Sequence, residues 1–283
     1  MIEHPELRVV PVRTPTLPPA THTNAYVLGR RRLTIIDPAS PWPDEQARLA
    51  EALQALVDEG AAVERILLTH HHVDHIGGVN ALRARFDAPV VAHPRTVELL
   101  QRSIAVDETL VDGDRVETDV EAWVALHTPG HASGHLCLHQ PGCGAIVAGD
   151  MVAGEGTIVL EPPEGDLAQY LAQLDRLRSL GPSVLFPAHG PALRDPARVL
   201  TEYIDHRHHR TAQLRAALAA HGPATPLALV PHIYGDTIPR FVHPLAARQV
   251  HCHLVWLADR GEVRSLEGDR WEMSDERRAP PRA

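Results

Sequence analysis

Short apolar runs and amphipathic stretches alternate along the first third of the chain. The strand-like runs are residues 24–29, 32–40, 63–70 and 88–94. Residues 43–60 and 77–86 carry apolar side chains at helical spacing, and we expect Asp44 to cap the first of these helices and Gly60 to end it. Strands that alternate with helices of this length predict a layered α/β domain.

The pattern changes in the middle third, where apolar stretches follow one another across short turns that contain glycine. Residues 115–130, 135–150 and 156–162 predict strands of an antiparallel meander. Helical spacing returns at residues 166–180, and a further strand is predicted at 183–190.

Beyond about residue 195 the periodicity is mostly helical, and the last apolar stretch, 262–273, predicts a hairpin. Helical segments followed by a hairpin indicate a winged-helix-like layout. We therefore predict an α/β domain over residues 1–195, a small helical, winged-helix-like domain over 196–275 and a disordered polar tail over 276–283.

Composition is ordinary for a soluble globular protein, with 44% apolar and 22% charged residues among 283. No apolar run reaches the roughly 18 residues that a membrane span needs, and the first residues lack the layout of a signal peptide, so we expect a cytoplasmic protein. The three cysteines, Cys137, Cys143 and Cys252, are too few and too scattered for a disulfide framework, and we expect them to be reduced. The net charge of −9 argues against a surface for non-specific nucleic-acid binding.

One stretch, LLTHHHVDHIGG at residues 67–78, gathers four histidines and an aspartate behind an apolar run. If the strand alternation persists, His70 and His72 point the same way, and the following turn brings Asp74 and His75 to a neighbouring point. Zinc takes four ligands, or three and a water molecule, so this stretch can begin two metal sites and complete neither. The missing ligands must come from elsewhere in the chain.

Three other strand-like runs each end in a histidine or an aspartate. His131 follows a Pro-Gly turn, Asp150 ends AIVAGD, and His189 ends VLFPAH. Because strand ends in layered sheets collect at one edge, we expect these side chains to meet the first cluster there.

Neighbouring residues receive supporting roles. We expect Asp37 to support a ligand histidine, His71 to face away from the cluster, and His127 and His135 to be structural.

These motifs resemble those of the metallo-β-lactamase-fold hydrolases. THHHVDHIGG, HTPGHASGH, AGD and PAHG occur in the order of that family's ligand motifs, over roughly residues 20–190. The resemblance is closest to the glyoxalase II branch of thioester hydrolases, while the helical tail resembles the winged-helix extension of the β-lactamase-like protein 2 group. The resemblance implies an αββα sandwich with a winged-helix-like C-terminal domain.

By the resemblance, His70, His72 and His131 hold one metal ion, and Asp74, His75 and His189 hold the other. Asp150 bridges the two. The ions are expected to be divalent and zinc, with iron and manganese as alternatives. The implied reaction is attack of a metal-bridging hydroxide on the carbonyl of a thioester or ester, with Asp74 also expected to orient the nucleophile or pass a proton to the leaving group.

Three rival functions are considered. A phosphodiesterase or endoribonuclease acting on single-stranded RNA would apply the same metal site to phosphorus, and a redox module would hold two irons. A DNA-binding regulator would use the tail, which offers few phosphate-binding residues. A small-molecule acyl substrate is thus the expected partner, with nucleic acid not favoured, no membrane, and self-association left open. Arg207 and Arg210 could contact an anionic substrate, but a solvated helix face is the favoured interpretation.

Overall fold

The computed structural model describes residues 5–101 and 103–274. Its first sheet has six strands in the order β1-β2-β3-β4-β5-β6, antiparallel from β1 to β3 and parallel from β3 to β6. These strands are β1 (Leu7–Arg13), β2 (His22–Leu28), β3 (Arg32–Ile36), β4 (Ala62–Leu67), β5 (Val90–Ala92) and β6 (Glu108–Thr109). The helices inserted among them are α1 (Pro43–Asp58), α2 (Val73–Ile76), α3 (Val79–Phe86) and α4 (Pro94–Leu99).

The second sheet has five strands in the order β11-β10-β9-β8-β7. They are β7 (Arg115–Val116), β8 (Trp123–His127), β9 (Leu136–Gln140), β10 (Ala145–Gly149) and β11 (Val184–Pro187). Strands β7 to β10 form an antiparallel meander, and β11 joins β10 in parallel after the crossover helix α5 (Leu167–Ser179). The predicted change from alternating strands and helices to a meander is confirmed.

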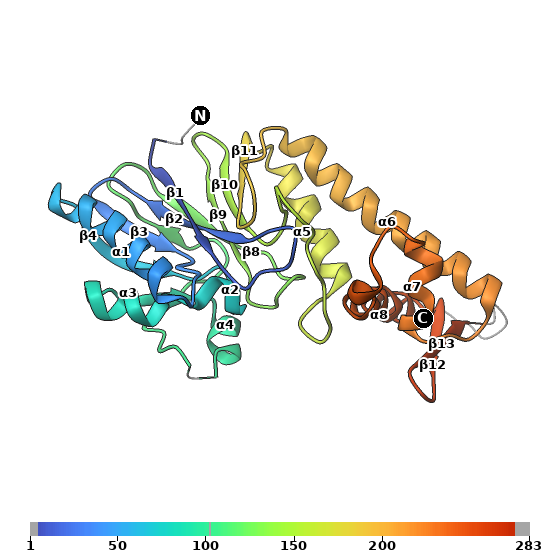
Figure 1. Ribbon diagram of the computed structural model, residues 1–283. Coiled ribbons are helices and arrows are strands. Elements are labelled where there is room, and N and C mark those ends of the chain that lie inside the picture. The colour runs from blue at the N-terminus through green and yellow to red at the C-terminus, as the bar shows by residue number, and fades with distance from the viewer. Residues whose placement is uncertain (1–4, 102, 275–283) are drawn as a thin grey trace.

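The sheets and helices are arranged as layers (Figure 1), and three buried apolar clusters lie between the layers. One lies between the first sheet and helices α1 and α3, a second between the two sheets, and a third between the second sheet and α5. This is the predicted αββα sandwich. Trp123 and Tyr170, the two largest fully buried side chains, lie in the second and third clusters.

The C-terminal part packs against the sandwich through the start of a long helix, which then runs away from it (Figure 1). Its elements are α6 (Pro196–His221), α7 (Pro226–Tyr234), the 3-10 turn η1 (Arg240–Val242), α8 (His243–Asp259), β12 (Val263–Leu266) and β13 (Arg270–Met273). They enclose an apolar cluster of their own, and Trp256 contacts both this cluster and the one beneath α5. The helical, winged-helix-like layout is confirmed, while the predicted disordered tail at 276–283 lies outside the described residues.

Strand direction explains why distant residues share one edge. Strands β3 and β4 are parallel, so Asp37 and the loop that begins at Leu68 leave the first sheet on the same side. In the second sheet β9 is antiparallel to both β8 and β10, and β11 is parallel to β10. Strands β8, β10 and β11 therefore all point the same way, and the chain leaves each of them near the same edge.

Three local predictions were wrong. Asp44 does not cap α1, because Pro43 takes the first helical position and Trp42 becomes the cap residue. Strand β4 ends at Leu67, so the histidines follow it in a loop. Residues 156–162 form no strand: the side chains of Ile158 and Leu160 are buried, but the Ile158 carbonyl accepts from side chains and not from a neighbouring strand.

Candidate metal centre

The structure brings all seven predicted ligands to one place. Three groups have ligand atoms that lie within 4.8 Å of one another. The groups are His70, His72 and His131; His70, His75 and Asp150; and Asp74, His75 and His189. Asp74 and His75 lie on the short helix α2, and the other five follow the carboxyl ends of β4, β8, β10 and β11.

Three ring nitrogens face one another in the first group. His72 Nδ1 lies 2.9 Å from both His70 Nε2 and His131 Nε2, which are 3.3 Å apart. Ligand atoms around a tetrahedral zinc with ordinary zinc–nitrogen distances lie about 3.4 Å apart. The triangle of nitrogens thus has nearly the size that one such ion needs.

Asp150 lies between the two groups and presents one oxygen to each. Its Oδ2 is 3.4 Å from His131 Nε2. Its Oδ1 is 3.5 Å from His189 Nε2 and 3.6 Å from His75 Nε2. Asp74 closes the second group, with Oδ2 3.6 Å from His189 Nε2. A carboxylate in this position is suited to bridging two cations.

Hydrogen bonds behind the rings fix which nitrogen carries the hydrogen. His131 Nδ1 lies 2.7 Å from the Val159 carbonyl and His189 Nδ1 lies 3.0 Å from the His22 carbonyl. A carbonyl oxygen only accepts, so each Nδ1 must be the donor. In the neutral ring Nε2 then presents a lone pair toward the cluster, which is the form that binds a metal ion.

Asp37 fixes two more rings in the same way. Its Oδ2 accepts from His75 Nδ1 at 2.8 Å and from the Thr69 hydroxyl at 2.6 Å. Because that hydroxyl donates to Asp37, it accepts from His70 Nδ1, 3.0 Å away. Asp37 is itself held by the Thr69 backbone N–H at 2.8 Å. The structure thus places Asp37 behind two ligand histidines, where the sequence analysis expected a supporting carboxylate.

The pKa values of the histidines in the cluster are shifted in opposite directions. Burial would lower the pKa of His75, but the carboxylates of Asp150, Asp37 and Asp74 outweigh burial and raise that pKa well above its ordinary value. Burial lowers the pKa of His70 far below its ordinary value and that of His72 to about 2. These carboxylates favour a proton on His75, so a cation that binds His75 competes with that proton.

Two atoms in the cluster lack a hydrogen-bond partner within the described part of the chain. They are His75 Nε2 and Asp150 Oδ1, and both are buried. Leaving a buried polar atom unpaired costs about 1–3 kcal/mol. Unpaired atoms that face one another across 3.6 Å fit a position for a divalent cation, and the mixture of imidazole and carboxylate donors suits zinc or iron.

His135 anchors Asp150 from behind. Its Nε2 accepts the Asp150 backbone N–H at 3.0 Å, and its Nδ1 lies 2.8 Å from the Thr128 hydroxyl. The preceding residue, Gly149, has φ +48°, and a Cβ there would lie 2.5 Å from His135 Nε2. The expectation that His135 is structural agrees with these contacts. His127 stacks on His93 at 3.9 Å and lies outside the three ligand groups.

A cavity of about 470 Å³ opens onto the cluster. Among its lining residues are His72, Asp74, His131, Asp150 and His189. His71, expected to face away, also lines it and is half-buried. The rest of the wall is largely apolar and is contributed by both the sandwich and the C-terminal part.

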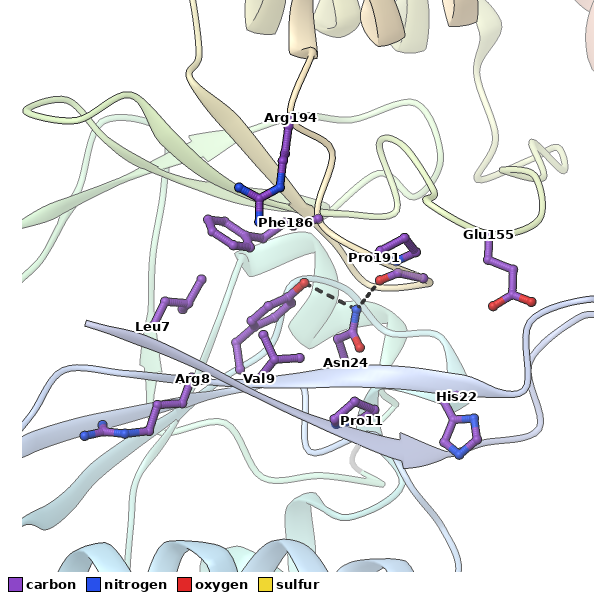
Figure 2. Close-up of a pocket in the computed structure, with 13 residues that line it drawn as sticks. Leu7, Arg8, Val9, Pro11, His22, Asn24, Glu155, Phe186, Pro191 and Arg194 are labelled. Atoms are coloured by element: carbon purple, nitrogen blue, oxygen red, sulfur yellow. Dashed lines mark hydrogen bonds between the residues drawn. The ribbon is translucent and has the colours of Figure 1, made fainter. Parts of the chain in front are cut away.

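A larger cavity, of about 830 Å³, lies between β1 and residues 190–194 (Figure 2). None of the predicted ligands lines it. Asn24 spans its inner wall, donating to the carbonyls of Pro187 and Gly190 at 2.9 Å each. The larger cavity is therefore not the one at which the predicted ligands meet, and the smaller cavity is the candidate functional site.

Two features of the site were missed by the sequence analysis. Asn24 fixes the turn that presents His189, and the backbone of Val159 fixes His131. Arg207, expected on a solvated helix face, is 4% exposed and donates to the Ile158 carbonyl at 2.6 Å. No sequence pattern predicts these contacts, because every residue has a backbone carbonyl that can accept a hydrogen bond. A buried arginine also has the same helical spacing as an exposed one.

Comparison with known proteins agrees with this geometry. Residues 18–189 match the family described as the metallo-beta-lactamase superfamily, and residues 225–271 match the beta-lactamase-associated winged helix domain. A beta-lactamase-like protein 2 homolog of Drosophila melanogaster is 31% identical over 261 residues, covering 86% of this chain and 84% of that protein. An atrochrysone carboxyl ACP thioesterase of Aspergillus chevalieri is 30% identical over 228 residues, covering 78% of this chain and 70% of that protein.

Solved structures give the same result. The crystal structure of a metallo-beta-lactamase family protein from Thermus thermophilus has a TM-score of 0.78 at 25% identity, covering 95% of this chain and 99% of that one. A structure described as a di-iron-bound form has a TM-score of 0.55 at 29% identity, covering 67% of this chain and 96% of the other. The chain belongs to the metallo-β-lactamase superfamily and carries that superfamily's associated winged helix domain at its C-terminal end.

Proposed function

We propose that this protein hydrolyses thioesters or esters with two divalent metal ions held by His70, His72, Asp74, His75, His131, Asp150 and His189. One observation carries the proposal: ring lone pairs and carboxylate oxygens from distant segments converge at the floor of a cavity with a mainly apolar wall. A relative named as an ACP thioesterase supports this substrate class.

Bound at these residues, two divalent ions would lower the pKa of a water molecule and polarise a substrate carbonyl. The chain's own groups orient the reactants. Asp74 lines the cavity and is partly exposed, unlike the buried His75, so its carboxylate can accept a proton from the attacking water and pass it to the leaving group. A thiol, with an ordinary pKa near 8.5, leaves readily and needs little help from an acid.

The rival substrate, single-stranded RNA, is disfavoured by the charges around the cavity. Apart from the predicted ligands, its charged lining residues are Glu155, Glu161 and Arg248. Arg248 donates to Glu161 at 2.8 Å, so the single lining cation is already paired. A phosphodiester backbone requires unpaired cations along its path, and this lining offers none.

The test compares the two substrate classes on one preparation. The protein is stripped with a chelator, reloaded with zinc, iron or manganese, and assayed with an acyl-thioester and with a single-stranded RNA oligonucleotide. We expect thioester hydrolysis that depends on added metal and falls at least a hundredfold in Asp150→Asn. RNA cleavage without thioester hydrolysis would overturn the proposal. Elemental analysis and a visible absorption spectrum of the protein as purified would distinguish zinc from iron.

We also propose a cytoplasmic location and an acyl compound as the main partner. No helix in the described ranges is both long enough and apolar enough to cross a bilayer. Cys137 and Cys252 are free, and burial raises the pKa of each thiol to about 12, which suits a reduced and unreactive state. Cell fractionation tests the location, and light scattering tests whether the chain forms oligomers.

A further inference from the structure

The cavity above the metal centre has walls from two parts of the chain that are far apart in sequence. One wall is the loop between β1 and β2, which contributes Pro15, Leu17 and Pro18. Another wall comes from the C-terminal part, where Val242 and Leu245 stand at the start of α8. Val73, at the start of α2 in the metal motif, lines the same cavity.

Large apolar side chains at this cavity are unusually exposed. Leu17 is 48% exposed and Val73 is 66% exposed, and both line the cavity. Phe241, 82% exposed, directly precedes the lining residue Val242. Apolar side chains exposed together beside a cavity mark a surface that a ligand covers, because exposing them to water has a cost that ligand binding removes.

Apart from the predicted ligands, the charged side chains of the lining are two glutamates and one arginine. The Arg248–Glu161 ion pair joins α8 to the 156–162 segment and leaves no free cation in the lining. Glu155 adds a negative charge to the lining. An acyl group that carries a carboxylate or phosphate would meet this charge without a partner, whereas an alkyl group would displace water from the apolar walls.

We propose that this interdomain cleft is an acyl-binding site and that the substrate is a thioester of an uncharged apolar acyl group. The inference rests on the proposed function. The acyl chain lies between Leu17 and Leu245, the carbonyl lies over Asp150, and the thiol portion extends out of the cleft. A water oxygen bonds to the carbonyl carbon, the carbon–sulfur bond breaks, and the thiolate receives the proton that the water loses, so that a carboxylic acid and a thiol are formed.

The first test is a series of thioesters that share one thiol and carry acetyl, butyryl, hexanoyl, octanoyl or decanoyl groups. Burying one methylene contributes enough free energy to raise kcat/KM by up to about fourfold. We expect kcat/KM to rise along the series until the cleft is filled, and a succinyl thioester to be a poorer substrate than the butyryl one. A flat series would overturn the inference.

Variants test whether the rise of kcat/KM with acyl length depends on the residues of the two walls. Leu17→Ser and Leu245→Ser, one from each wall, are each expected to reduce the increase in kcat/KM per methylene by at least half. Leu227→Ser is the matched control, because Leu227 is 52% exposed on α7 and does not line this cavity. The control is expected to keep the slope of the unchanged protein. An unaltered slope in both wall variants would contradict the assignment of the walls.

The two proposals fail in different ways. Thioester hydrolysis without a chain-length trend would refute the acyl cleft and leave the proposed function standing. If no thioester is hydrolysed, calorimetry with butyrate, hexanoate and decanoate tests the cleft by itself. Tighter binding of the longer carboxylates, lost in Leu245→Ser, would support the cleft, and equal or absent binding would refute it.

Discussion

The guanidinium of Arg207 donates to the carbonyl of Ile158, one residue before the Val159 carbonyl that accepts the Nδ1 hydrogen of His131. Gln249 on α8 donates to the same Ile158 carbonyl at 3.1 Å. Two helices of the C-terminal part thus hold the segment that orients a predicted metal ligand. Arg207 is buried over the Tyr170 ring, and its Nε has no partner among the residues described.

Replacing Arg207 with Met should weaken metal binding although Arg207 touches no predicted ligand. Without the Arg207 donor, the Ile158 carbonyl is held less firmly. The neighbouring Val159 carbonyl then becomes more mobile, and His131 loses its fixed orientation. We expect metal affinity to fall by about 10–100-fold in a chelator competition assay. Arg198→Met, on the exposed start of the same helix, is the control and should bind metal normally. A variant that is less stable but binds metal as tightly as the unchanged protein would refute this coupling.

Asp37→Asn tests the carboxylate that orients His75 directly and His70 through Thr69. Asn has nearly the same size and tolerates the left-handed φ of +49° at this position, so the backbone should persist. An amide has no charged oxygen that could accept from both His75 Nδ1 and the Thr69 hydroxyl. The hydrogen bonds that orient His75 and His70 should therefore be weaker. We expect metal affinity to fall by about 10–100-fold, with little change in the far-UV circular dichroism spectrum. Unchanged affinity would show that Asp37 only stabilises the fold.

A buried histidine away from the metal centre predicts acid sensitivity. Burial, with smaller effects from Arg207 and His206, lowers the pKa of His253 to about 3. Between the ordinary value of about 6.5 and this lower one, the unfolded chain binds a proton that the folded chain does not. The contribution of neutral His253 to the free energy of unfolding is thus complete above pH 6.5. It is lost, at about 1.4 kcal/mol per pH unit, as the pH falls toward 3.

His253→Gln removes that titration. In urea unfolding of the metal-free protein from pH 7.5 to 4.5, the free energy of unfolding should fall less steeply in this variant than in the unchanged chain. His209→Gln, at an exposed position on α6, should keep the original slope. Equal slopes in all three proteins would contradict the prediction.

Gly130→Ala should disturb the turn that presents His131. Gly130 has φ +137°, and a Cβ there would lie 2.4 Å from the backbone nitrogen of Tyr170 on α5. Helix α5 must then move or the turn must shift, so we expect a loss of several kcal/mol in stability. Thermal unfolding measures this loss, and Gly181→Ala is a useful comparison because Gly181 also has a positive φ but has no atom within 4 Å of its Cβ position. Equal losses in the two variants would attribute the effect to φ alone.

Most ligand positions could be predicted because they follow recognisable apolar strands. Asp150 and His189 stand directly beyond β10 and β11, and parallel strand directions bring such positions to one edge. The layered α/β class followed from the change between alternating and meandering elements, and the αββα sandwich was implied by the family resemblance. Asp37 could be anticipated for the same reason, since it ends the strand next to β4.

The segment 156–162 shows why other parts could not be predicted. Its alternating apolar side chains are those of a strand, and Ile158 and Leu160 are indeed buried. The segment differs from a strand in the donors that its carbonyls accept from. These donors are the side chains of His131, Arg207 and Gln249, which lie in three other parts of the chain. The sequence carries the side-chain pattern, whereas hydrogen-bond partners of the backbone depend on tertiary contacts.

This irregular segment also limits how the protein can be dissected. A fragment cut near residue 195 would retain every predicted ligand but lose both side chains that hold the Ile158 carbonyl. Such a fragment would also expose the sandwich surface against which Val199 and Leu200 pack. The appended helices are therefore part of the scaffold of the candidate metal centre, and exchanging them between relatives would require exchanging the segment they hold.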